Sequence, residues 1–501
     1  GEFVVDKEGH LGCAYKQGLF KIQDPFSDAP SIQQYFQDHQ GSNNSTLITK
    51  HLLIDNYNNL WMGTYNFGVY CHPLSQPFCK SLSLTDFKKE RLSQNYIISI
   101  TGQGNDIYMI IGYSDIFKYT QQTDQLSPLP VKNDYFTGTH LQDIKMSNDQ
   151  THLYIGTNKG LFIYNIHTHE IRQMQLSLPE QNRLFNTINI LQIAEDNEGR
   201  LWIGSWGNGI LCINQPLANP NIVLQLDTQT SPSILSDRIC QLFIHKEAVF
   251  LCTTQGLNRL VMNDKGEIAS LSSYRTNYST PGSSLSSDYL VSMDCENDST
   301  YWIGTIGGGL NKMVIHSEGN NDYTVTRYTT KDGLPNNNCE IVLLDHIGNV
   351  WIGGKGITRL NISQNKIYTY GYADGVPDNA FGSDAFYKAS NGMLYMGGLY
   401  GLSYFLPDHL TTKHDTPYTL IFTKLFVNNE QVIPNKTYDG KVLLNKVLDQ
   451  TSQLILNHRQ NNFSISFAAL NYNLSQRIAY RYRLKGFHKG WNVLHLSLIH
   501  I

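Results

Sequence analysis

Residues 201–211 read LWIGSWGNGIL, and this stretch decides the fold because its first half recurs along the chain. Bulky apolar residues that alternate and then meet a glycine are typical of a half-buried strand that enters a turn. We therefore expect Gly204 to end a strand and Trp206 to lie just beyond it. Eight further stretches match when they are aligned on this glycine: LGCAY (11–15), LWMGT (60–64), MIIGY (109–113), LYIGT (153–157), FLCTT (250–254), YWIGT (301–305), VWIGG (350–354) and LYMGG (394–398).

The spacing of these stretches predicts the architecture. The aligned positions are 14, 63, 112, 156, 204, 253, 304, 353 and 397, so one unit of about 48 residues occurs nine times. A period of this length with several strands per unit predicts the blades of a β-propeller. Each unit parses into four strands, and residues 323–361 give YTVTRYTT, NCEIVLLD, NVWIGG and GITRLN as the example.

Composition agrees with this prediction and excludes other classes. The chain has 501 residues, of which 41% are hydrophobic and 16% charged, with thirty tyrosines and forty glycines. Such usage favours β-structure with many tight turns over helical bundles. A net charge of −4 and the lack of a basic cluster interleaved with aromatics argue against a nucleic-acid partner. No apolar run approaches the roughly 18–20 residues of a membrane-spanning helix, and the first residues do not resemble a signal peptide.

Two resemblances follow from these motifs. The repeated unit, D-x-x-G-x-LWIGT-x-x-GGL-x-x-Y, resembles the two-component regulator propeller repeat. Residues 462–492, NFSISFAALNYNLSQRIAYRYRLKGFHKGWN, resemble the three-tyrosine immunoglobulin-like domain that follows such propellers, with Tyr472, Tyr480 and Tyr482 at the matching positions. Together they imply the periplasmic sensor region of a Bacteroidetes-type hybrid two-component regulator, over nearly the whole chain to about residue 492.

The resemblance implies an all-β fold class and a domain plan. Regulators of this kind combine two seven-bladed propellers, a sandwich domain, one membrane helix, and cytoplasmic histidine kinase, receiver and DNA-binding parts. We expect this chain to begin inside a blade, to stop inside the sandwich, and to lack the membrane helix and the catalytic parts. The expected domains are the last two blades of a truncated first propeller (1–76), a seven-bladed β-propeller (77–408), and a truncated immunoglobulin-like β-sandwich (409–501).

Two expectations concern the edges of this plan. A strand near residues 78–86 should pair with the strand at 402–406, because the ring otherwise keeps two open edges. Residues 493–501, VLHLSLIHI, do not continue the expected strand and turn pattern.

Strand parity locates a working surface. In a four-stranded antiparallel blade, the turn between the second and third strands and the connection to the next blade lie at the same end. Aromatics beside amides and carboxylates gather in these segments, and they suit an oligosaccharide, whose rings offer flat C–H faces and hydroxyls. We assign Asp384 to the last connection. The candidate ligand-binding residues are Tyr113, Asn158, Asn186, Trp206, Asn208, Arg238, Asp288, Tyr289, Asn337 and Tyr400.

The tryptophans divide into two groups. Trp61, Trp202, Trp302 and Trp351 recur at one position of the motif strand, so we expect them to pack between blades. Trp206 follows a strand, and its ring would either stack on a sugar or pack against a neighbouring blade. Both interpretations stay open.

The expected function is a ligand-sensing region that detects oligosaccharides and controls polysaccharide-utilisation genes through a homodimer formed by the sandwich domain. A polysaccharide or streptogramin-type lyase and a protein-binding scaffold are the alternatives. No GxSxG or HExxH motif is present, and no catalytic residue, metal or cofactor is predicted. The pair His167 and His169 is best explained by a surface hairpin.

The remaining motifs are interpreted structurally. The Asp-x-x-Gly steps at 196–199 and 345–348 are expected to be tight turns rather than calcium loops. The glycines at 307–309 are expected to form a turn between strands. The eight cysteines suit core positions, although Cys71 and Cys79 could bridge a hairpin in an oxidising compartment.

Overall fold

A computed structural model describes most of the chain, and its secondary structure is almost entirely β. The described residues are 3–6, 9–15, 18–27, 30–36, 49–55, 59–65, 68–73, 78–84, 96–131, 135–136, 138–263, 266–277, 279, 283–317, 322–371, 374–377, 380–409, 419–470, 480–494 and 498–500. Pro77–Thr411 form one compact unit, which we call the ring unit, and Gly1–Gln76 with Thr412–Ile501 form the other.

The ring unit contains seven antiparallel sheets of four strands each, consistent with propeller blades. In six of them the strands follow chain order, and the seventh takes one strand from the start of the unit. The first three sheets contain β9 (Ile97–Gln103), β10 (Asp106–Ile111), β11 (Asp115–Thr120) and β12 (Gln125–Pro128); β13 (Leu141–Met146), β14 (His152–Thr157), β15 (Gly160–Asn165) and β16 (Ile171–Gln173); and β17 (Ile190–Glu195), β18 (Leu201–Ser205), β19 (Ile210–Asn214) and β20 (Asn221–Leu226). The next three contain β21 (Ile239–His245), β22 (Ala248–Thr253), β23 (Gly256–Met262) and β24 (Ile268–Tyr274); β25 (Leu290–Cys295), β26 (Thr300–Thr305), β27 (Leu310–Ile315) and β28 (Tyr323–Tyr328); and β29 (Ile341–Leu344), β30 (Asn349–Gly354), β31 (Gly356–Asn361) and β32 (Lys366–Tyr370). The seventh sheet, which we call the closing sheet, contains β33 (Phe381–Lys388), β34 (Leu394–Gly398), β35 (Gly401–Phe405) and β8 (Lys80–Ser83).

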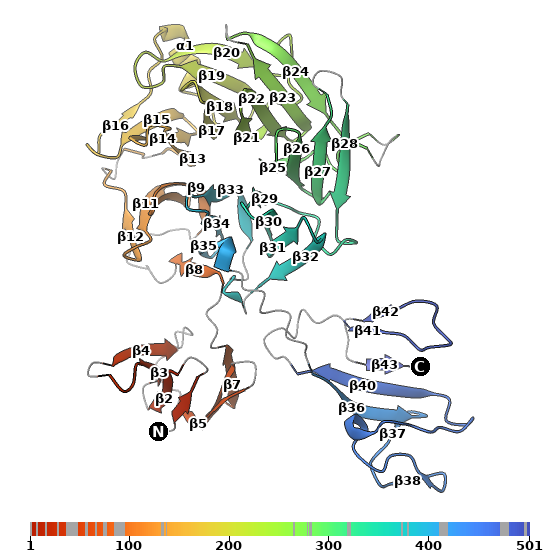
Figure 1. Cartoon of the computed structure of the whole chain (residues 1–501). Helices are drawn as coiled ribbons and strands as arrows, with labels where there is room; N and C mark the ends of the chain where they lie inside the picture. The colour runs from red at the N-terminus through yellow and green to blue at the C-terminus, as the bar shows by residue number, and fades with distance from the viewer. Residues whose placement is uncertain are drawn as a thin grey trace. The chain divides into compact units, whose positions relative to one another are not determined.

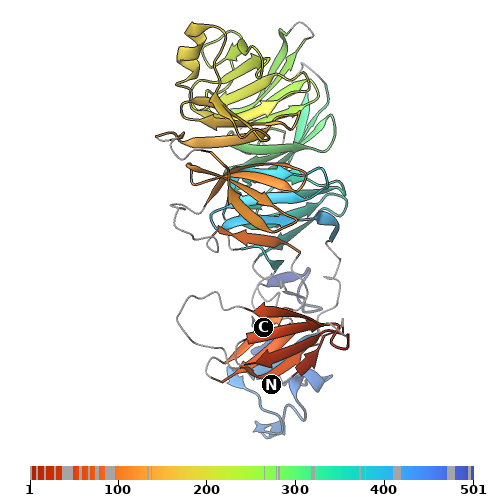
Figure 2. The same ribbon diagram turned by 90° about the vertical axis from the view of Figure 1, so that its left-hand side faces the viewer.

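These sheets succeed one another around a ring that closes on itself (Figure 1). The first strand of each sheet contacts the first strand of the next, and β33 of the last sheet contacts β9 of the first. β8 pairs with β35 from Ser83 opposite Gly401 to Lys80 opposite Tyr404. The expected pairing of residues 78–86 with 402–406 is therefore confirmed. The helix α1 (Pro179–Phe185) lies at the outer edge of the ring unit in both views (Figure 1 and Figure 2).

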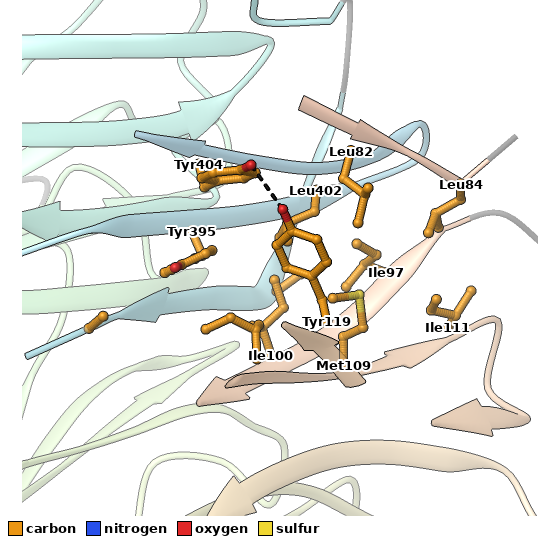
Figure 3. Packing of buried hydrophobic residues seen from close by; sticks show 13 residues of the cluster. Leu82, Leu84, Ile97, Ile100, Met109, Ile111, Tyr119, Tyr395, Leu402 and Tyr404 are labelled. Atoms are coloured by element: carbon orange, nitrogen blue, oxygen red, sulfur yellow. Dashed lines mark hydrogen bonds between the residues drawn. The ribbon is translucent and has the colours of Figure 1, made fainter. Parts of the chain in front are cut away.

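A hydrophobic core joins the closing sheet to the first sheet (Figure 3). Leu82 and Leu402 of the closing sheet belong to the same buried cluster as Ile100 and Met109 of the first. The hydroxyls of Tyr119 and Tyr404 lie 2.9 Å apart, across the boundary between the two sheets. Burial of apolar side chains from both sheets thus holds the ring shut.

Three of the four strand tryptophans pack between sheets, as expected, whereas Trp61 is only partly buried. Trp202, Trp302 and Trp351 are fully buried, and Trp302 shares a cluster with residues of the next sheet. Each indole also donates a hydrogen bond to a carboxylate six residues earlier in the chain. These pairs are Trp61 with Asp55 (2.9 Å), Trp202 with Asp196 (2.8 Å), Trp302 with Glu296 (3.0 Å) and Trp351 with Asp345 (2.8 Å).

The motif glycine is needed for close packing rather than for ending the strand. β18 runs through Gly204 to Ser205, so the expectation that Gly204 ends it is wrong. A Cβ atom at Gly204 would lie 2.8 Å from the Cγ2 atom of Ile239, on the next sheet. Only a residue without a side chain lets the two sheets approach this closely.

The sequence repeat and the structural sheet are offset from each other. Tyr323–Tyr328 form β28, which pairs with β27, whereas residues 341–361 belong to the following sheet. The grouping of residues 323–361 into one blade is therefore wrong, because the first strand of the sequence unit is the last strand of the preceding sheet. The expected turns are confirmed at 196–199, 345–348 and 307–309, and His167 lies in the turn between β15 and β16.

The other unit contains shorter sheets. Its N-terminal part has one sheet of β1 (Phe3–Val5), β2 (Leu11–Tyr15), β3 (Gly18–Gln23) and β4 (Ser31–Phe36), and one of β5 (Thr49–Ile54), β6 (Asn59–Thr64) and β7 (Val69–Pro73). Its C-terminal part has a sheet of β36 (Leu420–Val427), β37 (Glu430–Gln431), β40 (Phe463–Ala469) and β43 (Leu498–His500), and two pairs, β38 (Thr437–Tyr438) with β39 (Lys441–Val442) and β41 (Tyr480–Tyr482) with β42 (Asn492–Leu494).

Several tail expectations can be compared with these strands. Residues 498–500 pair with β40, so the expectation that the segment 493–501 leaves the strand pattern is wrong. Tyr480 packs edge-on against Phe467 at 4.8 Å, whereas Tyr472 lies outside the described residues. The immunoglobulin-like sandwich stays a prediction. All eight cysteines are free thiols, including Cys71 and Cys79, and Cys79, Cys212, Cys252 and Cys339 are buried.

Replacing Trp302 by Ala tests the role of the strand tryptophans. The substitution removes a fully buried indole and its hydrogen bond to Glu296, so we expect the free energy of unfolding to fall by about 3–5 kcal/mol. Trp206 is 41% exposed, and its replacement by Ala should change stability by no more than about 0.5 kcal/mol. Urea unfolding of both variants measures the difference. Equal losses of stability would contradict the division of the tryptophans into two groups.

Candidate functional site

The turns between second and third strands meet the sheet-to-sheet connections at one end of the ring unit, which we call the connection face. Backbone hydrogen bonds join the two kinds of segment. Trp206 N–H donates to Asn189 O (3.0 Å), Gly207 N–H to Asp237 O (2.8 Å), and Gly309 N–H to Asn337 O (2.8 Å). These bonds confirm that the two kinds of segment lie at a common end of the sheets, whereas ligand binding by the predicted residues stays a prediction.

Three of the predicted residues converge on this face. Trp206 forms an isolated β-bridge with Arg238, whose guanidinium lies 5.0 Å from the centre of the indole ring. Arg238 has no ion pair among the described residues. Tyr289 is 40% exposed in the connection between β24 and β25, and burial raises its pKa while the charge of Arg238 lowers it. Two exposed aromatic rings and a guanidinium without an ion pair among the described residues thus lie on this face.

A polar group from the inner strands adjoins these side chains. Gln192, buried on β17, donates from Nε2 to Oδ1 of Asp384 at 2.7 Å, which links β17 to β33. Asp384 lies inside β33, so its assignment to a connection is wrong. After burial, the charge of Asp384 contributes to raising the pKa of both Cys240 and Tyr289, and this electrostatic influence is what relates Asp384 to the exposed residues of the face.

Burial controls the protonation of these inner groups. Removal from water raises the pKa of Asp384 well above its usual range, and the nearby Asp143 raises it further. Burial also raises the pKa of the Cys240 thiol to about 12, with a further contribution from Asp384. The carboxyl of Asp384 is therefore a hydrogen-bond donor over a wider pH range than an exposed aspartic acid.

A buried acceptor completes the arrangement. The side-chain oxygen of Asn189 is buried and has no hydrogen-bond partner in the described part of the chain, while its backbone oxygen binds Trp206. A buried carbonyl oxygen of this kind costs about 1–3 kcal/mol if nothing donates to it. We call Asn189, Gln192, Trp206, Arg238, Tyr289 and Asp384 the connection-face cluster.

Other predicted residues form a separate group or are engaged in the fold. Tyr113 stacks on His140 at 6.0 Å, and Asn158 accepts a hydrogen bond from the backbone of His140 at 2.8 Å. Asp288 accepts hydrogen bonds from both the backbone and the hydroxyl of Thr276. Three predicted asparagines are engaged in hydrogen bonds: the side chain of Asn186, which follows α1, accepts one from Gln173, the backbone N–H of Asn208 donates one to the Ser205 hydroxyl, and the side chain of Asn337 accepts one from the backbone of Thr330. Tyr400 is exposed between β34 and β35.

Sequence reasoning missed Asn189 and Gln192. One repeat position is shared by Asp143, Gln192 and Gln241. Each of them is the first paired residue after a register shift in the first strand of its sheet. A polar residue recurring within an otherwise apolar strand was the available signal. Asn189 carried no such signal, because its importance depends on the lack of a partner in three dimensions.

The arrangement suits binding of a polyhydroxylated molecule. Aromatic rings offer flat apolar surface, whereas Arg238, Asp384 and the Asn189 oxygen offer donors and an acceptor within one region. One face of the Trp206 ring is covered by the guanidinium, so a ligand ring would stack on the other face or on Arg238 itself. In the described part of the chain, no group of three or more His, Cys, Asp or Glu side chains could hold a metal ion.

Comparison with known proteins gives three findings. Residues 184–207 match the family model described as two component regulator propeller. Histidine kinase P4 of Formosa agariphila is 24% identical over 419 residues, which make up 81% of this chain and 29% of that kinase. The extracellular domain of a hybrid two component system from B. thetaiotaomicron has a TM-score of 0.72 at 20% identity, over 100% of this chain and 63% of that domain.

These findings confirm the resemblance to two-component regulator propeller proteins. The matched segment includes Asn189, Gln192 and Trp206 of the connection-face cluster. The structural similarity shows that the fold is shared, and the chain spans less than a third of the length of the kinase. Virginiamycin B lyase from Staphylococcus aureus is 13% identical over 65% of this chain and 98% of the lyase, with a TM-score of 0.46. No helix among the described residues is long and apolar enough to cross a membrane.

Replacing Asp384 by Asn tests the protonation of the cluster. A carboxyl whose pKa is raised in the folded state makes that state less stable as the pH rises above about 4, where the unfolded residue ionises. Asparagine cannot ionise and keeps an oxygen for Gln192. We therefore expect the variant to melt at a higher temperature than the parent at pH 8, with the difference shrinking towards pH 4.

Asp143→Asn is the matched control for this experiment. Both oxygens of Asp143 accept hydrogen bonds, from Ser99 at 2.6 Å and from the backbone of Ile144 and Ile193 at 2.9 and 2.7 Å. An amide would turn a donor towards one of these donors, so this variant should lose about 1–3 kcal/mol at pH 4. Burial also raises the pKa of Asp143, so this loss should become smaller towards pH 8 but should not become the gain expected for Asp384→Asn. A pH dependence of melting that is the same in Asp384→Asn and the parent would contradict the raised pKa.

Proposed function

We propose that this chain, which carries two-component regulator propeller repeats, is the ligand-sensing part of the periplasmic region of a hybrid histidine kinase and response regulator. The ligand is an oligosaccharide, and the sensor controls genes for polysaccharide use. The 24% identity to a histidine kinase and the fold shared with an extracellular domain of a two component system support the sensor role. The kinase and DNA-binding activities would belong to parts of the regulator other than this chain.

The connection-face cluster is the proposed binding site. The single observation that carries this assignment is the contact of the Trp206 ring with Arg238 next to Asn189, which binds the Trp206 backbone and whose buried side-chain oxygen has no partner among the described residues. Sugar hydroxyls supply the donor that this oxygen lacks, and sugar C–H faces match the exposed rings. The guanidinium and the Asp384 carboxyl then donate to ring and hydroxyl oxygens.

Signalling requires that the ligand distinguish two states of the protein. A ligand that binds both states equally shifts nothing, however tight the binding. We propose that the bound oligosaccharide favours one arrangement of the C-terminal domains in a homodimer. Differential contacts in the two arrangements would supply the coupling free energy.

Binding of oligosaccharides to the purified chain tests the proposal. We expect isothermal titration calorimetry against plant and host oligosaccharides to identify at least one ligand. Trp206→Ala should weaken its binding by about tenfold, which corresponds to about 1.4 kcal/mol, because stacking surface is lost. Trp206→Phe should retain most of the affinity.

Trp491→Ala is the matched control, since Trp491 is also exposed (55%) and also lies over an arginine, Arg481, at 5.1 Å. It should bind as the parent does. Full affinity in Trp206→Ala would show that the site is misplaced, and a complete panel without a ligand would contradict oligosaccharide sensing. Release of unsaturated or shortened products during the titrations would instead favour a lyase.

A further inference from the structure

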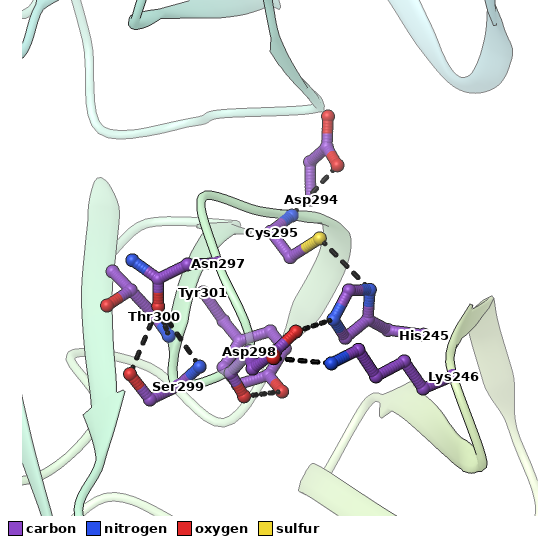
Figure 4. A network of polar contacts seen from close by, with 9 residues as sticks. All are labelled: His245, Lys246, Asp294, Cys295, Asn297, Asp298, Ser299, Thr300 and Tyr301. Atoms are coloured by element: carbon purple, nitrogen blue, oxygen red, sulfur yellow. Dashed lines mark hydrogen bonds and ion pairs between the residues drawn. The ribbon is translucent and has the colours of Figure 1, made fainter.

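A thiol, an imidazole and a carboxylate are linked at the end of the ring unit away from the connection face (Figure 4). Sγ of Cys295, on β25, lies 3.4 Å from Nδ1 of His245, on β21. Nε2 of His245 lies 3.0 Å from Oδ1 of Asp298, and Lys246 binds the other oxygen of Asp298. The chain of contacts crosses from one sheet to the next.

This geometry fixes how the imidazole meets the thiol. Asp298 accepts a hydrogen bond from Nε2, which leaves Nδ1 as the acceptor that faces Cys295. Phe243 stacks parallel to the imidazole at 6.5 Å and Tyr301 meets it edge-on at 6.3 Å, so the ring is held on both sides. A nucleophile next to a base that a third group orients is the arrangement found in activated nucleophiles.

Cys295 differs from the other described cysteines in this respect. Cys79, Cys212, Cys252 and Cys339 are buried. Cys71 is exposed, and Cys13 and Cys240 are partly exposed, but none of these three has a hydrogen bond to a histidine among the described residues. Within the described part of the chain, Cys295 combines partial exposure with a hydrogen bond to a histidine.

The backbone decides which reaction the thiol can perform. The N–H of Cys295 donates to Oδ1 of Asp294 at 2.8 Å, so it cannot serve as an oxyanion donor for acyl transfer. Thiol–disulfide exchange needs no such donor, because it requires only a thiolate, access and a leaving thiolate.

We propose that Cys295 forms mixed disulfides with small disulfides, assisted by His245 as the base and positioned by Asp298. His245 Nδ1 accepts the thiol proton while Sγ attacks one sulfur of the disulfide. A bond forms between Sγ and that sulfur, the original S–S bond breaks, and the leaving thiolate takes the proton from His245. One disulfide and one thiol are consumed, and one mixed disulfide and one thiol are produced. The proposed periplasmic location is an oxidising compartment in which such disulfides persist.

The surrounding charges make the base necessary. Burial raises the pKa of Cys295, Asp294 and Asp298 raise it further, and Lys388 lowers it. Asp298 is itself paired with Lys246, and Asp294 accepts from the backbone of Leu344 on the neighbouring sheet. At neutral pH few thiolates form without assistance, so removal of the proton by His245 should set the rate.

The test is the rate at which the 501-residue chain reacts with glutathione disulfide, measured by mass spectrometry of the peptide that contains Cys295. Cys71→Ser is the background variant, because it removes the most exposed thiol. His245→Phe keeps an aromatic ring but removes the base, and we expect it to lower the rate at pH 7 at least tenfold. The difference should shrink as the pH approaches the range in which the thiol ionises by itself. Asp298→Asn should give a smaller reduction.

His346→Phe is the control, because His346 lies near the same end of its sheet, just after the first strand β29, and also binds an aspartate, Asp408, at 3.0 Å. It should not change the rate at Cys295. Thermal melting separates a loss of reactivity from a loss of fold. The proposal is overturned if Cys295 reacts no faster than the buried cysteines, or if His245→Phe and the parent have the same pH–rate profile.

Discussion

The hydrogen bond between each strand tryptophan and a carboxylate six residues earlier is the interaction on which the repeat depends. A buried indole N–H needs an acceptor, and in three of the four pairs the acid that supplies it, Asp55, Asp196 or Asp345, also accepts backbone hydrogen bonds of the turn between the first two strands. Asp345 accepts from the backbone of Ile347 and Asn349 and from the Trp351 indole at 3.0, 2.8 and 2.8 Å. One carboxylate thereby fixes a turn, a strand and the core between two sheets.

The two ends of the ring unit differ in whether side chains or backbone groups hold the turns together. At the end that carries the turns between first and second strands, acidic side chains accept hydrogen bonds from tryptophans and form ion pairs, such as that of Asp196 with Arg200. At the connection face, backbone hydrogen bonds join neighbouring segments, which leaves side chains such as Trp206 and Arg238 directed to other contacts. The fold can therefore tolerate variation at the connection face without losing its framework.

The features that recur in every repeat could be predicted from the sequence, whereas the features that depend on contacts between repeats could not. The period, the turns and the buried tryptophans follow from local patterns, and the pairing of β8 with β35 follows from the need to close the edges. Gly204 was misjudged because its neighbour, Ile239, lies on another sheet. Of the connection-face cluster, the aromatic residues and Arg238 were predicted from their place in turns. The hydrogen bond between Gln192 and Asp384 joins two strands that are far apart in the sequence, and no local sequence pattern predicts such a contact.

The closing sheet also decides how the ring unit can be loaded mechanically. In the closing sheet β8 begins at Lys80 and β35 ends at Phe405, and the register places Lys80 opposite Tyr404, at the end of the sheet away from the connection face. Tension between the two flanking segments would therefore act on adjacent ends of β8 and β35. It would peel these strands apart one hydrogen-bonded pair at a time, which takes less force than sliding them past each other. Under such tension the seventh sheet would therefore unfold first, and the other six would bear the load only after β8 has separated from β35.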